Sequence, residues 1–488
     1  MLKKLLFSSF IAFVFLFFWW ICANYIDSDF GWHVKVGELI VNKGLPKTDP
    51  FSYTMPSYPY IDHEWLVNVI IYIIHEHLGY MVLAGLFAFT AVAVPFVIFS
   101  LTSFPFAVIP TILMYTVFIG RMGIRVQVIG WLFFAVFLRV MTDKKLYKKG
   151  KWILPFIMIL WTNIHGSFPL GIVVFMLYVV VNIFQYRKIV LTDILIGFLL
   201  LLATFVTPYG IQAWDEVRRQ IFAPYIHQYI LEWLPFYVLI DVGFFVSAAL
   251  LGSLFFCYIK KETLWWYVIL LFILFVAGLS ALRHMPLFVI AGGFLLAQYL
   301  RWLFKEAKQP AFYSTLILVV LGAFSLTGLV YLKDATRYKP KAFYPSEALA
   351  YIGRNKLQGR IFAPYVWGGY IIWKLPDHKV FIDGRMPSFR FDAPDGESDF
   401  VFEDYISLLK GRNLNKLFQR YNVKYIMVQK PAEKKHDAID MLFVQMGLML
   451  PSQKDASFEN ALRKVRVRKV YEDKTTVLYF YSQKNRIL

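Results

Sequence analysis

Long apolar runs separated by short polar segments constrain this chain more than any other feature of its sequence. A spanning helix needs about 20 mostly apolar residues, and about eleven runs approach that length. They lie at the N-terminus and near residues 80–101, 104–120, 126–142, 152–164, 168–185, 190–206, 236–259, 263–282, 285–300 and 311–332. The 488 residues are 58% hydrophobic and 17% charged, which is not typical of soluble globular proteins. The sequence therefore predicts an α-helical polytopic membrane protein with about 11 transmembrane helices.

Basic residues gather in the loops at one side of these helices. Lys3 and Lys4 precede the first run, which no small-residue cleavage site follows, so we expect an uncleaved anchor with a cytoplasmic N-terminus. Counting helices alternately then makes each strongly basic short loop cytoplasmic, as the positive-inside rule requires. These loops contain Lys144, Lys145, Lys148, Lys149, Lys151, Arg187, Lys188, Lys260, Lys261, Arg301, Lys305 and Lys308. The net charge of +19 is therefore attributed to topology and not to nucleic-acid binding.

Two segments are predicted to lie outside the membrane on the opposite, extracytoplasmic side. The first is an outer loop over residues 24–79, part of a transmembrane domain spanning 1–332. It is rich in Pro, Tyr and Ser, and we expect it to pack onto the membrane face. Its apolar stretch 65–78 is shorter than a span and predicts an interfacial helix. The second is residues 333–488, where mixed helix and strand patterns predict an extracytoplasmic α/β domain.

Within the C-terminal domain, several segments predict individual elements. Residues 359–366, 378–385 and 422–429 have strand patterns, and two later segments predict a closing hairpin. The sequences VWGGY and FIDGR are typical of tight turns. A second interpretation is that Asp383 and Arg385 face the membrane site.

Acidic residues and histidines in the first loop are the strongest candidates for chemistry. Asp27 and Asp29 directly follow the first helix, and on an extended loop their side chains would point to opposite sides. An acid pair alone belongs more often to an ordinary solvated loop than to a site in which it acts as a general base or metal ligand. His33, and then His63 with Glu64 later in the loop, make the two interpretations about equal.

Three arginines stand at the predicted outer ends of helices. Arg121, Arg125 and Arg283 could bind phosphate through two parallel hydrogen bonds. Each could also extend to lipid headgroups, which is the commoner role of a single arginine at such a position. As a group beside acids and histidines they favour phosphate binding, and Arg283 with His284 is the strongest pair.

Two further motifs carry polar residues at the same side. In WTNIHGSF, Asn163 and His165 end an apolar helix, and His165 could bind a metal, donate to a phosphate or cap the turn. The spacing of a known metal motif such as HExxH does not occur. Glu232 beside Trp233 suits a sugar, because an aromatic face stacks on the ring while the acid binds hydroxyls. It equally suits an interfacial aromatic belt.

The order of these motifs resembles a group of bacterial multi-spanning membrane proteins in the GT-C glycosyltransferase superfamily. The resemblance covers nearly the whole chain and rests on DSDFGWH, GLPKTDPFSYT, YIDHEWL, WTNIHGSF, TPYG, ILEW, RHMPLF, WGGYIIW and FIDGR. The group commonly has two tryptophans before the first-loop histidine, a second glycine after HisGly, and AsnProTyrGly. This chain has Gly31-Trp32, Ser167 and Thr207 at those places, which leaves the acids intact.

The resemblance implies a membrane glycosyltransferase of the cell envelope in the bacterial inner (plasma) membrane. Such an enzyme moves a hexosyl or pentosyl group from a polyprenyl-phosphate-linked sugar donor to an extracytoplasmic acceptor, which is a glycan, lipid or protein. An outer-loop acid acts as the base, here Asp29 or Asp27, with Glu64 or His63 in support. Arg283 and His284 would bind the lipid phosphate. The substrate-binding candidates are His33, His63, Arg121, Arg125, Asn163, His165, Glu232, Arg283 and His284. A divalent metal ion takes part in some members of the superfamily and not in others.

Two other classes of protein remain open. A transporter would also carry polar groups at helix ends, but it usually has charges near the bilayer midplane and broken, repeated halves. A non-catalytic envelope-assembly protein would explain an outer domain without needing clustered acids. The sequence leaves open the sugar, the acceptor, the metal dependence and the oligomeric state.

Overall fold

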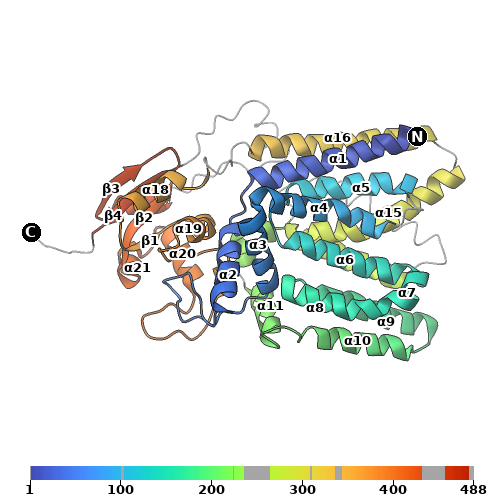
Figure 1. Ribbon diagram of the computed structural model, residues 1–488, viewed down its shortest axis with the longest axis horizontal. Helices are drawn as coiled ribbons and strands as arrows, with labels where there is room; N and C mark the ends of the chain where they lie inside the picture. Colours follow the sequence, from blue (N-terminus) through green and yellow to red (C-terminus); the bar gives the residue numbers. More distant parts are fainter. Residues whose placement is uncertain are drawn as a thin grey trace, which may run out of the picture.

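The computed structural model of the chain describes residues 2–99, 104–223, 225–235, 264–307, 310–335, 343–430 and 457–482. Within these ranges the chain forms a bundle of long helices and a smaller domain that combines helices with a sheet (Figure 1). The smaller domain lies at one end of the bundle, which we call the domain end. The predicted fold class, a helical membrane part followed by a C-terminal α/β domain, is confirmed at this level.

The bundle consists of helices that run alongside one another (Figure 1). In the described ranges they are α1 (Leu2–Asn24), α4 (Tyr80–Ile98), α5 (Phe104–Ile119), α6 (Gln127–Thr142), α8 (Leu154–Ile164), α9 (Pro169–Tyr186), α10 (Leu191–Ala203), α14 (Trp265–Ser280), α15 (Met285–Ala307) and α16 (Pro310–Ala335). Five segments in this described part are long and apolar enough to cross a membrane. Other apolar helices have only 10–17 residues, so the predicted count of about eleven spans is not supported. The predicted span at 236–259 lies outside the described residues.

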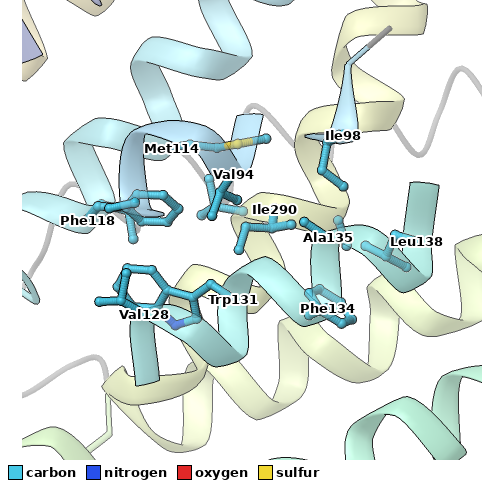
Figure 2. Close-up of a cluster of buried hydrophobic side chains, with 14 of the residues drawn as sticks. Val94, Ile98, Met114, Phe118, Val128, Trp131, Phe134, Ala135, Leu138 and Ile290 are labelled. Carbon is cyan, nitrogen blue, oxygen red and sulfur yellow. The ribbon is translucent and has the colours of Figure 1, made fainter. Parts of the chain in front are cut away.

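Apolar side chains from four helices pack against one another at the centre of the bundle. Figure 2 shows Val94 of α4, Met114 and Phe118 of α5, Trp131 of α6 and Ile290 of α15 converging on one another. The rings of Phe118 and Trp131 stack with centroids 4.5 Å apart. Between helices in a membrane, such close packing replaces the hydrophobic effect as a source of association. This core fixes the helix ends on which polar residues stand.

The two ends of the bundle differ in chemical character. The short basic helix α7 (Lys144–Gly150) lies at the end away from the C-terminal domain, as does the N-terminus (Figure 1). At the domain end lie α2 (Phe30–Lys43), α3 (Trp65–Leu78) and α11 (Gln212–Phe222), and the four-residue α12 (Ile226–Tyr229) follows α11 in the chain. The basic helix α7 and the acidic first loop therefore lie at opposite ends of the bundle, as the sequence predicts.

The C-terminal domain is built on a four-stranded sheet. Its elements are α18 (Ser346–Arg354), β1 (Arg360–Phe362), α19 (Gly368–Lys374), α20 (Val401–Leu409), α21 (Leu414–Arg420), β2 (Val423–Gln429), α23 (Ser457–Leu462), β3 (Val467–Glu472) and β4 (Thr476–Tyr481). The strand order is β1-β2-β4-β3, with β1 parallel to β2 and the other pairs antiparallel. The predicted hairpin of β3 and β4 is confirmed. The predicted strand at 378–385 is wrong, because Val380 makes only isolated bridges with Ser52 and Ile361.

The first loop and the C-terminal domain share one hydrophobic core. Tyr53, Met55, Tyr58 and Tyr60 of the loop are buried among residues of the domain. The Tyr53 hydroxyl also donates to the carbonyl of Ile361 over 2.9 Å. The loop also contacts the domain end of the bundle, where Arg219 of α11 donates to the Tyr58 hydroxyl over 2.8 Å, and its packing onto the membrane face stays a prediction. Its aromatic side chains complete the domain's core, and so they tie the domain to the residues that follow the first helix.

Two glycines allow a close backbone contact between α2 and α19. A Cβ atom at Gly31 would collide with the carbonyl oxygen of Gly369, and one at Gly369 would collide with that of Ser28. The tight turn predicted for VWGGY is wrong, because Gly368 and Gly369 begin helix α19. Glycine is required here because the two backbones touch. The contact places the C-terminal domain directly beside the Asp27–Asp29 segment.

Candidate active site

Asp27 and Asp29 form a turn at the start of α2, and the extended loop predicted for them is wrong. Asp29 has a helical backbone conformation (φ −92°, ψ −17°) and is the N-cap residue of α2. Its backbone N–H donates to Oδ1 of Asp27 over 3.0 Å. The other oxygen of Asp27 accepts from Nε of Arg125 at 2.5 Å. Asp27 is therefore engaged by an ion pair with Arg125 and by the turn, which makes it less available to accept a proton from a substrate.

Asp29 lies instead against the C-terminal domain. A Cβ atom at Gly384 would collide with Oδ1 of the Asp29 carboxylate. Burial raises the pKa of Asp29 from 3.8 to about 7, and the negative charge of Asp27 acts in the same direction. A carboxylate with a pKa near neutrality is well matched to accept a proton at physiological pH. Of the two first-loop aspartates, Asp29 is thus the better candidate base.

Glu64 lies at the centre of three histidines. Its carboxyl oxygens are 4.0 Å from Nδ1 of His33, 3.7 Å from Nε2 of His63 and 3.9 Å from Nε2 of His165. These separations exceed the range of a hydrogen bond. The four side chains come from α2, from the end of the first loop and from the residue after α8. They line a polar site in which a substrate hydroxyl could bind between partners.

Burial controls the charge of this group. It raises the pKa of Glu64 well above 4.5, and the charges of Asp62 and Asp29 act in the same direction. Burial also lowers the pKa of His33 and that of His63 from 6.5 to about 4, and lowers that of His165 well below 6.5. Burial therefore favours the neutral form of each of these four side chains. Glu64 can donate a hydrogen bond as well as accept one.

A relay of hydrogen bonds fixes the tautomer of His33. Its Nδ1 lies 2.6 Å from Oδ1 of Asn68, whose Nδ2 donates to Oδ2 of Asp62 over 2.8 Å. Because Asn68 gives its amide hydrogens to Asp62, its oxygen must accept from His33. Nδ1 of His33 therefore carries the proton, and Nε2 retains a lone pair. Asn68 is fully buried in the apolar first half of helix α3.

A second set of hydrogen bonds fixes His165 in the opposite tautomer. The backbone N–H of Ser167 donates to Nδ1 of His165 over 3.2 Å, and the Ser167 hydroxyl lies 2.6 Å from the same nitrogen. The hydroxyl oxygen also accepts from Nε1 of Trp161 over 3.0 Å. Nδ1 of His165 is thus an acceptor, and the proton resides on Nε2, the nitrogen closest to Glu64.

Two arginines face one carboxylate at the edge of this cluster. Nη1 of Arg283 is 3.4 Å from Oε1 of Glu232, and Nη1 of Arg125 is 4.0 Å from Oε2. The guanidinium of Arg283 lies over the ring of Trp233, 4.3 Å from its centroid. Both arginines are partly exposed, so each keeps N–H groups that can bind an anion. Two cations beside Asp29 and Glu64 make the site suitable for a phosphate-bearing substrate.

Three predicted site residues are engaged with the protein backbone. Arg121 donates to the carbonyls of Val117 and Leu282, and His284 lies 3.1 Å from the carbonyl of Ala277. Asn163 donates to the carbonyls of Ile159 and Val206, and its oxygen accepts from Nε1 of Trp65. These residues stabilise helix ends around the site. The structure brings together the other nine predicted residues, which are Asp27, Asp29, His33, His63, Glu64, Arg125, His165, Glu232 and Arg283.

Asp383 and Arg385 belong to a separate network. Arg385 donates to both oxygens of Asp383 and, over 2.8 Å, to Oδ1 of Asp49. All three side chains are buried. Asp383 and Arg385 therefore do not face the candidate site. Their ion pairs join the first loop to the C-terminal domain.

The described side chains do not form a metal site. Among residues in the described ranges, no three His, Cys, Asp or Glu groups stand close enough together to hold one ion. Asp27 is paired with Arg125, and burial favours the protonated form of Glu64. The described donor groups as placed do not fit a divalent cation.

Some of the site's residues were not singled out from the sequence. Asn68 is the clearest case, although an asparagine inside the apolar stretch WLVNVII, one turn after Glu64, is a visible signal. Ser167 appeared only as a departure from a family pattern, yet it orients His165. Gly384 was assigned to a turn, and its contact with Asp29 arises only from the docking of two distant segments.

Comparisons with known proteins identify the fold. No protein-family model matches the sequence, and no curated protein sequence matches it. The chain is similar to the crystal structure of the Archaeoglobus fulgidus oligosaccharyltransferase in the apo form, with a TM-score of 0.53 and 11% identity over 98% of this chain and 74% of that one. It is also similar to AglB from the same archaeon in complex with an inhibitory peptide and a dolichol-phosphate, with a TM-score of 0.53 and 11% identity over 100% and 75% of the two chains. A complex of the archaeal enzyme with Zn and sulfate matches with a TM-score of 0.52 and 10% identity over 86% and 67%.

These similarities define a class of fold. The chain shares the fold of these structures: a bundle of apolar helices that carries a C-terminal domain with a small sheet. Within that class, all three of these similar structures are archaeal oligosaccharyltransferases. The predicted arrangement, apolar helices followed by a C-terminal domain with a small sheet, is therefore confirmed.

Proposed function

We propose that this protein is a membrane glycosyltransferase that moves a sugar from a polyprenyl-phosphate-linked donor to an extracytoplasmic acceptor. The observation that carries the proposal is the position of Asp29. Its carboxylate has a pKa of about 7, and the charges of Arg125 and Glu232 act on it. A near-neutral base and a pair of anion-binding arginines at the end of a membrane helix bundle suit transfer from a lipid phosphate.

The reaction is a single displacement at the anomeric carbon of the sugar. The acceptor hydroxyl gives its proton to Asp29, and its oxygen forms a bond to that carbon. The bond from the carbon to the phosphate oxygen breaks at the same time, and the electron pair leaves with the polyprenyl phosphate. General base catalysis of this kind contributes about 10²–10⁴-fold to a rate.

Arg283 and Arg125 would bind the phosphate of the sugar donor. The lipid phosphate gains negative charge as the bond to the sugar breaks, so an adjacent guanidinium stabilises the transition state more than the ground state. Glu64, His33, His63 and His165 would hold sugar or acceptor hydroxyls. The fixed tautomers supply both kinds of partner: Nε2 of His33 accepts a hydrogen bond, and Nε2 of His165 donates one.

The test is transfer from a panel of radiolabelled polyprenyl-phosphate sugars by the purified protein in lipid vesicles. We expect wild type to transfer from at least one sugar donor and Asp29→Asn to lose about 10²–10⁴-fold of that rate. Asp215→Asn is the matched control, because Asp215 is an exposed acid at the domain end of the bundle. Full activity of Asp29→Asn would remove Asp29 from the mechanism. Release of sugar donor across the vesicle without transfer would favour a transporter.

The membrane orientation is part of this proposal, and the fold allows a direct test of it. Cysteines introduced at Asp395 and at Lys148 would lie on exposed positions near opposite ends of the molecule. In a variant lacking Cys22 and Cys257, a membrane-impermeant thiol reagent added to intact cells should label position 395 and not position 148. The reverse pattern would place the site in the cytoplasm and overturn the extracytoplasmic acceptor.

A further inference from the structure

Glu232 occupies the space between the two arginines that the proposed function assigns to the sugar donor's phosphate. We infer that the Glu232 carboxylate is a stand-in for that phosphate: in the free protein it is the counterion of Arg283 and lies beside Arg125, which is already paired with Asp27, and it is displaced when the lipid phosphate binds. The inference rests on the proposed function and adds a regulatory residue to it. It gives Glu232 a different role from the sugar-binding one that its neighbour Trp233 suggests in the sequence.

The distances show that Glu232 is held loosely. Its two oxygens lie 3.4 and 4.0 Å from the guanidinium nitrogens of Arg283 and Arg125, beyond the usual range of an N–H···O hydrogen bond. Arg125 is bound much more closely to Asp27, at 2.5 Å. Among the described residues, Glu232 makes no side-chain hydrogen bond short enough to hold its carboxylate. A phosphate could therefore compete for both cations.

The surroundings allow the side chain of Glu232 to move while the arginine stays in place. Trp233 lies against the guanidinium of Arg283, and the backbone N–H of Leu282 donates to the carbonyl of Leu234 over 3.0 Å. The short helix η3 (Leu231–Trp233) is thus tied to the segment that carries Arg283. The side chain of Glu232 is 38% exposed, whereas that of Arg283 is 22% exposed. Displaced by an anion, Glu232 can turn towards solvent without unfolding its helix.

The chemistry of the ligand follows from this geometry. A carboxylate has two oxygens and one charge, and it bridges the two guanidiniums at long range. A phosphate monoester or diester has more acceptor oxygens in a tetrahedral arrangement and forms charge-assisted hydrogen bonds with guanidinium. The exchange of Glu232 for phosphate therefore improves the pairing of both arginines. While no sugar donor is bound, Glu232 supplies a counterion to Arg283 at the membrane surface.

The test measures binding of a polyprenyl phosphate, with inorganic phosphate as a second probe, to the purified full-length protein. Removing the competing charge by Glu232→Gln should tighten binding of both probes by roughly 2- to 5-fold, the coupling typical of exposed ion pairs. The increase in affinity caused by Glu232→Gln should be smaller in a protein that also carries Arg283→Ala, because one of the two cations is then missing. If Glu232→Gln bound only the polyprenyl phosphate more tightly, and not inorganic phosphate, the effect would come from lipid contacts and the inference would be overturned.

Glu38→Gln is the matched control. Glu38 is equally exposed, at 38%, and forms an ion pair with Lys35 at 2.6 Å on α2. It should leave both affinities unchanged. Unchanged or weaker binding by Glu232→Gln, with wild type binding normally, would overturn the stand-in role and leave the proposed function intact. A wild-type protein that binds no polyprenyl phosphate and transfers no sugar would overturn both.

Discussion

Two networks of carboxylates and arginine lie close to each other at the domain end of this molecule, and they differ in how completely they are paired. Around Arg385, four hydrogen bonds of 2.6–3.0 Å join one guanidinium and its backbone N–H to Asp383 and Asp49. Around Glu232, the corresponding distances are 3.4 and 4.0 Å. The first network is buried, whereas the arginines of the second are partly exposed.

The difference separates a structural role from a functional one. A buried ion pair is tolerated only when its charges and hydrogen-bonding groups are satisfied, and the Arg385 network meets that condition. The network of Arg125, Glu232 and Arg283 leaves guanidinium N–H groups available, next to an acid whose pKa is about 7. Arginines that are incompletely paired, next to an acid with a shifted pKa, are typical of a binding site. Four predictions test this contrast, from the largest expected effect to the smallest.

Removing Arg385 should damage stability most. Arg385→Met would leave Asp49 and Asp383 buried without a cation, and breaking a buried pair in this way costs about 3–5 kcal/mol. The measurement is the free energy of unfolding of the detergent-solubilised protein, followed by denaturant titration. Arg390→Met is the control, because Arg390 is an exposed cation of the same domain. A loss equal to that of the control would show that the Arg385 network is not structural.

Adding a methyl group at Gly384 should damage catalysis and spare the fold. Its Cβ atom would collide with the end of the Asp29 side chain, which can rotate away, so the base is displaced. A misplacement of about 1 Å can cost roughly 10²-fold in rate. The partner variant Gly31→Ala collides with the backbone of Gly369, which cannot rotate away. It should cost about 1–3 kcal/mol of stability, as overpacking does. The measurements are the transfer rate and the free energy of unfolding of both variants. If both quantities fell in both variants, the distinction between a catalytic contact at Gly384 and a structural one at Gly31 would be wrong.

Removing Arg283 should weaken binding of the sugar donor with little loss of stability. A charge-assisted hydrogen bond contributes about 1.5–3 kcal/mol, and Arg283→Ala should raise the KM for the sugar donor accordingly. Lysine restores the charge without the planar pair of N–H groups, so Arg283→Lys should recover activity in part. The measurement is transfer rate against sugar-donor concentration. Overlapping curves for wild type, Ala and Lys would make Arg283 a membrane anchor.

Ionisation of Asp29 should raise activity and lower stability as pH increases. As a base it must be ionised, so kcat/KM should fall as pH decreases below about 7. Its folded pKa is raised above its unfolded value of 3.8, so the folded state binds the proton more tightly. The stability it contributes is complete below pH about 4 and is lost as pH rises towards 7. Asp29→Asn should remove that decline. A stability curve identical to that of wild type between pH 4 and 8 would contradict the raised pKa.

Much of the site could be predicted from the order of motifs. Alternating spans carry Asp29, Glu64, His165 and Arg283 to one side of a helical bundle, and the structure places them in one cluster. The roles of Arg121, Asn163 and His284 were harder to predict, because these residues end helices that are apolar on every side. Such a helix has no amphipathic stripe to fix its rotation, so packing decides whether an end residue faces the site or its own backbone.

The amino-acid sequence by itself determined which residues lie near the site, because apolar length and loop charge set the direction of each helix. Only the tertiary structure decided which acids are paired. Asp27 lies 98 residues from Arg125, and Asp49 lies 336 residues from Arg385. Arg125 pairs with Asp27 and leaves Asp29 to respond to burial, whereas Arg385 pairs with both Asp49 and Asp383. The pKa of Asp29 is therefore mainly a property of the packed chain, since desolvation by burial is the largest cause of the shift and the charge of the neighbouring Asp27 adds to it.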